Sequence, residues 1–266
     1  MDLADIREYV PGDDVRHIDW NVTARMDTPY VREYHEDREI TAHFLLDVSP
    51  SVDFGTATAL KRDLLIDFVA VLARLLTRHG NRVWAVVYGK GVERVIPARG
   101  GRVQVLRLID SLEKRPRLKE APATSLTDLL QTGLRSMRRR SLVFVISDFF
   151  TTPGWEKALT ELSRRHEVLA IRLVDPRERE LPEIGMVVMN DAETGEHVWV
   201  DTNDRRFRAR FADVVRKREE ALASTFRRAG IDALELSTEE DLVRSVVRFA
   251  TVRKIKRSRA QRGKVA

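Results

Sequence analysis

The sequence contains no cysteine, which excludes disulfides, thiolate zinc sites and a cysteine nucleophile. It has no apolar run long enough to cross a bilayer, and no signal peptide opens the chain. The absence of cysteine suits a reducing compartment, so we expect a cytoplasmic protein. The 266 residues, 43% of them hydrophobic, suffice for one substantial core.

Several signatures of enzymes are also missing. The sequence has no Gly-rich phosphate loop, no GxSxG nucleophile elbow and no GxGxxG dinucleotide fingerprint. Its six histidines show no HExxH spacing. These absences argue against the commonest nucleotide-binding, serine-hydrolase and metalloprotease classes.

Positive charge is concentrated at the C-terminal end of the chain. Residues 253–266 contain seven Lys and Arg and no acid, so subtracting them from the net charge of +6 leaves −1 for the rest. We expect a disordered, solvated basic tail. The alternative is binding of nucleic acid, or peripheral contact with an anionic membrane, and either would depend strongly on salt.

The rest of the chain is organised around the stretch ITAHFLLDVSPS, residues 40–51. Its first half has the β-branched, aromatic and apolar side chains of a buried strand. The strand stops at Asp47, and Ser49 and Ser51 follow at alternate positions. Ligands bind beyond the carboxyl ends of parallel strands, and carboxylate and hydroxyl oxygens suit a hard cation such as Mg²⁺. The alternative is that Ser49 or Ser51 merely caps the next helix.

Apolar periodicity predicts alternating strands and helices after this stretch. We expect helices over 58–79, 102–112, 126–138, 153–165, 206–229 and 239–252, and strands over 82–88, 92–96, 142–146, 168–174 and 231–236. The strand 92–96 should return antiparallel at a sheet edge. The pattern is typical of an α/β fold with a doubly wound, mostly parallel sheet and helices on both faces. A small β-hairpin insertion is expected near residues 185–202.

Two later polar residues are further candidate oxygen ligands. Thr124 lies in a loop before a helix, and Asp148 follows the apolar strand 142–146. Because the carboxyl ends of parallel strands share one edge, we expect the candidate ligands to converge there. These ligands are Asp47, Ser49, Ser51, Thr124 and Asp148. The alternative for the second loop is that Thr124, Ser125 or Thr127 caps the following helix.

Three regions are expected: an N-terminal arm over 1–39 packed on the body, a body over 40–252, and the tail over 253–266. The arm is polar and turn-rich, and residues 30–34 are expected to form an edge strand leading into the central one. Its aspartates offer two interpretations. Asp13, Asp14 and Asp19 either form a second acidic metal site or pair with Arg7, Arg16 and Arg25, which would dock the arm on the body.

The five candidate ligands carry a resemblance to a known site. The pattern Asp47-x-Ser49-x-Ser51, with Thr124 in a later loop and Asp148 after a later strand, resembles the metal-ion-dependent adhesion site of von Willebrand factor A domains. In that family the two serines and the threonine supply hydroxyl ligands to Mg²⁺ or Mn²⁺, and the two aspartates bind directly or through water. The resemblance implies a von Willebrand factor A-like fold with such a metal site.

Longer segments resemble a bacterial family called domain of unknown function 58, often encoded beside MoxR-type AAA+ ATPases. The segments are REYVPGDDVRHIDWNVTAR at 7–25, ISDFF at 146–150, DPRERELPEIG at 175–185 and DAETGEHVWVDT at 191–202. The resemblance covers about residues 3–256. Pro50 and Val52 stand where small residues and methionine are common in that family. Members often carry membrane segments before the first motif, so this chain is either a soluble member or one with an incomplete start.

The resemblance implies a metal-dependent protein-binding module rather than an enzyme. An acidic residue of a partner would complete the coordination of the metal. The implied partner is a MoxR-type AAA+ ATPase, a client protein or both, and the implied role is a chaperone-like adaptor in the assembly or activation of protein complexes. The alternative is a metal-dependent phosphohydrolase with Asp47 as nucleophile. Phosphotransferases of that type usually need a second acid two positions on, where Ser49 stands.

Overall fold

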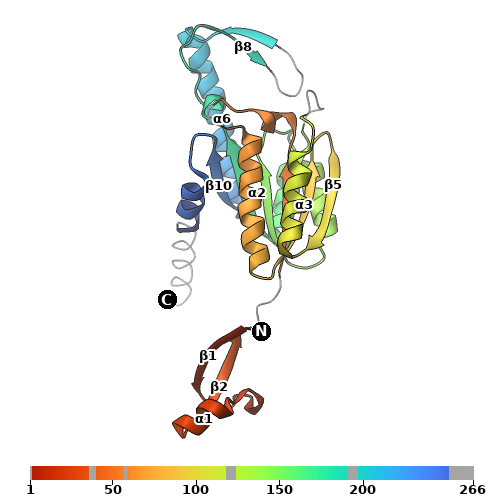
Figure 1. The fold of residues 1–266 in the computed structure, drawn as a ribbon. Coiled ribbons are helices and arrows are strands. Elements are labelled where there is room, and N and C mark those ends of the chain that lie inside the picture. Colours follow the sequence, from red (N-terminus) through yellow and green to blue (C-terminus); the bar gives the residue numbers. More distant parts are fainter. Residues whose placement is uncertain (1, 36–39, 57–58, 118–123, 191–196, 252–266) are drawn as a thin grey trace. The chain divides into compact units, whose positions relative to one another are not determined.

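The computed structural model describes residues 2–35, 40–56, 59–117, 124–190 and 197–251 (Figure 1). The chain divides into two compact units, Met1–Glu39 and Ile40–Ala266, which are taken separately below. The predicted basic tail and the turn of the predicted hairpin lie outside the described residues.

The larger unit is built on a six-stranded sheet with the order β10-β7-β6-β3-β4-β5. Its strands are β3 (Thr41–Asp47), β4 (Arg82–Tyr88), β5 (Val92–Arg99), β6 (Leu142–Ser147), β7 (Glu167–Val174) and β10 (Asp232–Ser237). Neighbouring strands pair in parallel except β4 and β5, which are antiparallel. The antiparallel return strand was predicted at a sheet edge, and β5 confirms it.

Helices cover both faces of this sheet (Figure 1). They are α2 (Lys61–Arg78), α3 (Gly101–Glu113), α4 (Leu126–Ser136), α5 (Trp155–Arg165), α6 (Arg205–Ala229) and a last helix over 242–251, with short 3₁₀ turns η2 (Pro50–Asp53) and η3 (Pro176–Glu178). The helices α2, α3 and 242–251 contribute to one hydrophobic cluster, and α4, α5 and α6 to the other. The predicted fold class, an α/β fold with a doubly wound, mostly parallel sheet and helices on both faces, is confirmed.

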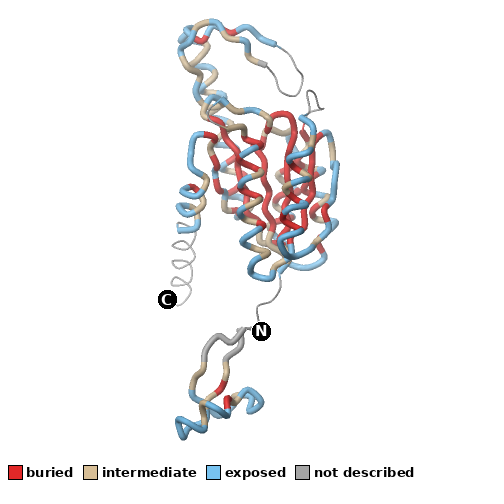
Figure 2. The backbone as a smooth tube through the Cα atoms, in the orientation of Figure 1, coloured by how far each residue is buried: buried red, intermediate tan, exposed pale blue. Residues whose placement is uncertain are grey.

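The central strand β3 is buried on both sides because helices lie on both faces of the sheet. Phe44 and Leu45 are successive residues of β3, and both are fully buried. Phe44 belongs to the hydrophobic cluster on one face of the sheet and Leu45 to the cluster on the other face. This is the alternation that a strand imposes on successive side chains. Figure 2 shows the buried backbone concentrated in the strands. The strand ends are therefore held by rigid, well-packed elements.

The predicted hairpin is present as β8 (Met186–Asn190) and β9 (His197–Asp201), paired antiparallel. The helix predicted over 206–229 is present as α6, but its apolar residues are only partly buried. Leu222 and Phe226 are buried, whereas Val214 is 65% exposed. The helical spacing is real, but only the C-terminal part of α6 joins the hydrophobic cluster.

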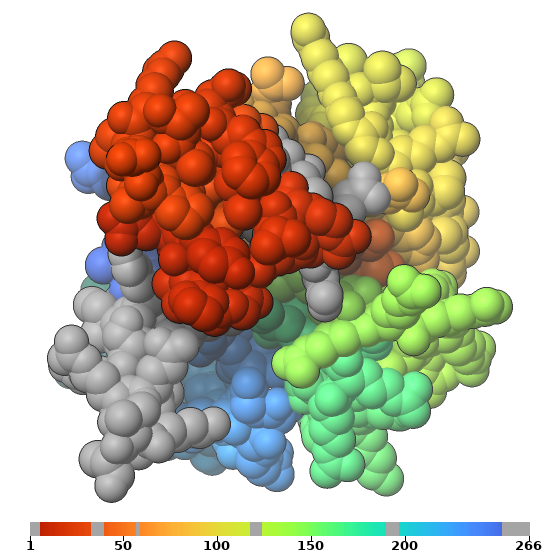
Figure 3. All heavy atoms as spheres, turned by 90° about the horizontal axis from the view of Figure 1, so that it is seen from below, coloured from red at the N-terminus to blue at the C-terminus, as the bar shows by residue number. Residues whose placement is uncertain are grey.

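The smaller unit, the N-terminal arm, has its own two-stranded sheet. Its elements are β1 (Asp2–Glu8), η1 (Val15–His17), α1 (Trp20–Met26) and β2 (Tyr30–His35). Residues 30–34 form a strand as predicted, but β2 pairs with β1 and not with the six-stranded sheet, so the predicted lead into the central strand was wrong. The side chains of the arm form a compact group, coloured red to orange in Figure 3. Packing of the arm on the body stays a prediction.

Ion pairs inside the arm account for the three aspartates that the sequence analysis singled out. The pairs are Arg7–Asp13 at 2.7 Å, Arg16–Asp14 at 2.8 Å and Arg32–Asp19 at 2.8 Å. The interpretation as paired charges was right, but the partner of Asp19 is Arg32 and not Arg25. Asp19 also caps α1, accepting hydrogen bonds from the backbone N–H groups of Asn21 and Val22. Among the described residues these three carboxylates do not gather where they could hold a metal ion, so the alternative of a second acidic metal site was wrong.

Candidate metal centre

Two candidate carboxylates stand at the ends of neighbouring strands. Asp47 is the last residue of β3, and Asp148 follows Ser147, the last residue of β6. The strands are paired in parallel with Leu46 opposite Ile146. Asp47 is 0% exposed and Asp148 is 1% exposed. The fold therefore places two buried carboxylates side by side at the carboxyl edge of the sheet, as the sequence predicted.

The carboxylate of Asp47 is hydrogen-bonded but has no cationic partner among the described residues. Its Oδ1 accepts the backbone N–H of Ser49 at 3.0 Å, and its Oδ2 accepts the hydroxyl of Ser147 at 2.6 Å. Burial, and then the charge of Asp148, raise the pKa of Asp47 to about 6, although the hydrogen bonds from Ser147 and Ser49 act in the opposite direction. A positive ion at this place would relieve both causes.

The two serines lie close together beside this carboxylate. Ser49 is 1% exposed, Ser51 is 9% exposed, and their Oγ atoms are 3.2 Å apart. Ser49 precedes η2, yet its side chain makes no capping hydrogen bond. Pro50 takes the first position of η2, where a backbone N–H is not needed. The capping alternative therefore does not describe Ser49.

Thr124 is fixed next to the loop that carries Asp148. It is 0% exposed, and its carbonyl accepts the hydroxyl of Thr151 at 2.7 Å and the backbone N–H of Thr152 at 3.0 Å. Ser125 precedes α4 without a side-chain capping bond. These contacts join the loop before α4 to the loop after β6. That all five predicted ligands share one ion stays a prediction.

The backbone after Asp148 is strained. Phe149 has a φ of 59°, the left-handed region that non-glycine residues seldom adopt. Its ring packs against Trp155 and Phe226, with centroids 5.5 and 5.1 Å away. The next N–H, from Phe150, donates to Oδ1 of Asp148 at 3.0 Å. The left-handed turn thus directs one ring into the core and one N–H onto the candidate ligand.

Sequence reasoning missed three residues of this site: Ser147, Lys61 and Glu178. The Nζ of Lys61 lies 2.7 Å from Oδ2 of Asp148 and 2.5 Å from Oε1 of Glu178. Burial by itself lowers the pKa of Lys61, but the charges of Asp148 and Glu178 outweigh it, so the pKa is raised above its ordinary value. A sequence signal existed, because Lys61 stands at helical spacing from the buried residues Leu65 and Phe68.

A third carboxylate, Asp175, follows β7, and among the described residues its buried charge is compensated by hydrogen bonds alone. It accepts hydrogen bonds from the backbone and hydroxyl of Thr56, the backbone of Arg177 and the hydroxyl of Thr238. Burial acts to raise its pKa, but these hydrogen bonds prevail and lower it. Asp175 is therefore a satisfied structural carboxylate that joins three loops.

The candidate ligands at this edge of the sheet are carboxylate and hydroxyl oxygens, and this chemistry limits which metal ions they could bind. Over the part of the chain that the structure describes, no three His, Cys, Asp or Glu side chains gather where they could hold a metal ion. A metal at Asp47 and Asp148 would therefore depend on the hydroxyls of Ser49, Ser51 and Thr124. Such an all-oxygen set fits Mg²⁺ or Mn²⁺ and does not fit zinc held by thiolate or imidazole.

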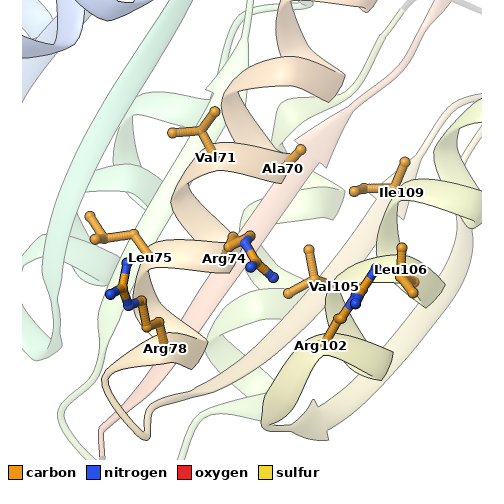
Figure 4. A pocket seen from close by; sticks show the side chains of 9 residues that line it. All are labelled: Ala70, Val71, Arg74, Leu75, Arg78, Arg102, Val105, Leu106 and Ile109. Atoms are coloured by element: carbon orange, nitrogen blue, oxygen red, sulfur yellow. The ribbon is translucent and has the colours of Figure 1, made fainter.

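A separate groove of about 700 Å³ runs between α2 and α3 (Figure 4). Its lining is mainly apolar, with Val71 and Leu75 on α2 and Leu106 on α3, and arginines at its rim. None of the five candidate ligands lines it. The groove therefore plays no part in the metal site.

The family follows from comparison with known proteins. Residues 5–221 match the family described as "Protein of unknown function DUF58". The chain belongs to the DUF58 family. An uncharacterized protein of Mycobacterium tuberculosis is 37% identical over 248 residues, covering 93% of this chain and 78% of that protein. One from Mycobacterium avium is 36% identical over 159 residues, covering 60% of this chain and 94% of that protein.

A solved structure shares the fold of this DUF58 protein. It is an aerotolerance-related membrane protein from Bacteroides fragilis, with a TM-score of 0.52 and 15% identity, covering 78% of this chain and 96% of that one. At this identity the likeness concerns the fold alone. Among the described residues, no helix has the length and apolar character to span a membrane.

Proposed function

We propose that this DUF58 protein is a metal-dependent protein-binding module. Mg²⁺ or Mn²⁺ would be held by Asp47, Ser49, Ser51, Thr124 and Asp148. The observation that carries the proposal is the pair of buried, neighbouring carboxylates, of which Asp47 has no cationic partner among the described residues. Two close buried like charges are costly unless a cation compensates them.

The residues at the site are already oriented for this task. The hydroxyl of Ser147 and the N–H of Ser49 orient Asp47, and the N–H of Phe150 orients Asp148. Each carboxylate oxygen keeps lone pairs beyond these bonds. When bound, the metal would offer a coordination position to an acidic side chain of a partner, which gives a charge-dependent contact.

The partner that we propose is a MoxR-type AAA+ ATPase, a client protein, or both. The support is the resemblance to a family often encoded beside such ATPases, now joined by the family match over residues 5–221. The role would be a chaperone-like adaptor in the assembly or activation of protein complexes. We place this activity in the cytoplasm, and we assign peripheral membrane contact to the basic segment 253–266 as the alternative to a solvated tail.

We favour binding over catalysis. The alternative is a metal-dependent phosphohydrolase with Asp47 as nucleophile. A nucleophile has to reach its substrate, but Asp47 is 0% exposed and both of its oxygens accept hydrogen bonds. No described contact supplies the second acid that such chemistry usually needs at the position of Ser49.

The test is metal-dependent capture of a purified MoxR-type ATPase by the immobilised full chain. We expect capture in Mg²⁺, loss in EDTA, and loss in Asp47→Ala even with Mg²⁺. The matched control is Asp67→Ala, which removes an exposed carboxylate from α2 and should capture normally. Capture that is unchanged by both EDTA and Asp47→Ala would overturn metal-dependent binding.

A further inference from the structure

A fully buried lysine lies against the candidate metal site. Lys61 opens α2, and its side chain is 0% exposed. Its ammonium group pairs with Asp148 at 2.7 Å and with Glu178 at 2.5 Å. The rings of Phe54 and Phe150 flank it, with centroids 5.7 and 5.4 Å from Nζ. A cation of the chain itself therefore already occupies one side of this acidic site.

The charges around Asp148 are unevenly matched. Asp47, Asp148 and Glu178 bring three carboxylates, and Lys61 brings one ammonium in direct contact with two of them. The guanidinium of Arg218, which lies over the ring of Phe150, acts on Asp148 and Glu178 as a second positive charge without an ion pair to either among the described residues. In a buried setting such charges interact strongly over several ångströms. An ammonium held on Asp148 therefore repels a divalent ion that approaches the same carboxylate. It also keeps Asp148 paired when no metal is present, which limits the cost of burying this charge.

We propose that Lys61 is a resident counter-ion that sets the affinity of this site for divalent metal. The inference rests on the metal site of the proposed function and deepens it. Lys61 stabilises the metal-free protein and keeps metal binding weaker than the oxygen ligands alone would give. A carboxylate from a partner then supplies the missing negative charge. Firm metal retention thereby becomes coupled to partner binding.

Glu178 shares the ammonium group of Lys61 with Asp148, so substituting Glu178 should change metal affinity in the opposite direction to substituting Lys61. It lies in η3, its side chain is 15% exposed, and its second oxygen accepts the backbone N–H of Asp175 at 3.1 Å. Glu178 draws part of the Lys61 charge away from Asp148. Removing the negative charge of Glu178 leaves the ammonium to Asp148 alone. Lys61→Met and Glu178→Gln should therefore move metal affinity in opposite directions.

The experiment measures Mn²⁺ binding to the full chain by electron paramagnetic resonance of the free ion. We expect Lys61→Met to bind Mn²⁺ about tenfold or more tightly than wild type, and Glu178→Gln to bind several-fold more weakly. Lys114→Met is the matched control, because it breaks an exposed lysine–carboxylate pair on α3 and should leave affinity unchanged. Lys61→Met should also unfold at a lower temperature without metal and gain more from Mn²⁺ than wild type.

The outcomes separate this inference from the proposed function. If wild type binds no Mn²⁺, the metal site itself is wrong and the inference fails with it. If wild type binds Mn²⁺ and Lys61→Met binds it equally or more weakly in a folded sample, Lys61 has only a structural role and the inference alone is overturned. If Lys61→Met does not fold, Glu178→Gln decides: weaker binding supports the role of Lys61, and equal or tighter binding contradicts it.

Discussion

Asp47 is a buried acid whose surroundings oppose its charge. Three neighbouring strands are each followed by or end in a buried aspartate, and the three carboxylates differ in the hydrogen bonds and ion pairs that compensate their charge. Asp175 receives four hydrogen bonds and Asp148 receives an ammonium and an N–H, whereas Asp47 receives hydrogen bonds from Ser147 and Ser49 but no ion pair from the described residues. Asp47 is thus the least compensated of the three carboxylates.

Replacing this carboxylate by its neutral isostere should stabilise the metal-free protein. At pH 7.5 with EDTA, Asp47→Asn should raise the free energy of unfolding by about 1–3 kcal/mol, because it removes a buried charge and keeps the shape. Urea denaturation followed by circular dichroism measures this change. A less stable Asn variant at this pH would show that the charge of Asp47 is already compensated.

The same substitution has a defined pH dependence. The pKa of Asp47 is about 6 in the folded protein, against an ordinary value of 3.8. Between these values the folded state holds more protons than the unfolded state, so stability contributed by Asp47 falls as pH rises from about 4 to about 6. The gap between Asp47→Asn and wild type should be full above pH 6 and close towards pH 4. A gap that is independent of pH would contradict the raised pKa.

At the level of residues, the sequence indicated where the candidate ligands stand along the chain, but not what surrounds them in the structure. The alternation of Asp47, Ser49 and Ser51 after an apolar strand is local, so the strand end could be predicted from it. Lys61 meets Asp148 across 87 positions of sequence and Glu178 across 117 positions. Their pairing depends on tertiary packing, and the sequence offered only a lysine among the apolar positions of a helix.

At the level of elements, the loop between β6 and α5 combines strain with anchoring. A left-handed non-glycine residue costs roughly 1–3 kcal/mol, whereas truncating a buried phenylalanine costs about 3–5 kcal/mol. The anchoring of Phe149 by Trp155 and Phe226 therefore exceeds the strain that it imposes. This balance explains how the loop persists without glycine at that position.

Two substitutions of Phe149 separate these effects. Phe149→Ala should lose about 3–5 kcal/mol, since it removes the ring and keeps the backbone strain. Phe149→Gly should be more stable than Phe149→Ala by about 1 kcal/mol, because glycine tolerates the positive φ. At Phe150, whose φ is not positive, Ala should equal or exceed Gly. Urea denaturation gives all four values, and an Ala variant more stable than Gly at position 149 would refute the strain.

Apolar periodicity predicted which segments form helices and strands, but it did not predict all of the contacts between these elements. The helices and the parallel strands follow repeats of apolar residues that the sequence displays directly. The apolar spacing of α6 did not reveal its charged contacts with the sheet. Arg172 pairs with Glu219, and Arg179 joins Glu219 to Glu235 on β10. A charged helix surface does not reveal such pairs before the elements are assembled.

At the level of the whole molecule, charge is distributed in blocks. Residues 1–39 contain eleven Asp and Glu and five Arg, a net charge of −6. Residues 1–252 together carry −1, so subtracting −6 leaves +5 for residues 40–252, and the segment 253–266 adds seven more positive charges. The net charge of +6 is thus the sum of an acidic arm and a basic end, and we expect the basic end to dominate non-specific binding to anions.

Deleting residues 253–266 should sharply reduce retention on an immobilised polyanion such as heparin. The deletion removes seven positive charges from one short segment, and polyanion binding weakens steeply as such charges are lost. The salt concentration at elution measures the effect. Divalent-metal binding by the truncated chain is the control and should be unchanged. Equal elution of the full and truncated chains would place the polyanion contact elsewhere.

The most direct test of the central claim is a calorimetric titration of the full chain with Mg²⁺, with Asp47→Ala alongside. The titration is repeated with acetate present, which offers the carboxylate that a partner would supply. We predict heat of binding in wild type, tighter binding with acetate, and no binding in Asp47→Ala. A folded wild-type chain that binds no Mg²⁺ with or without acetate, or an Asp47→Ala chain that binds it equally well, would contradict the metal-dependent site.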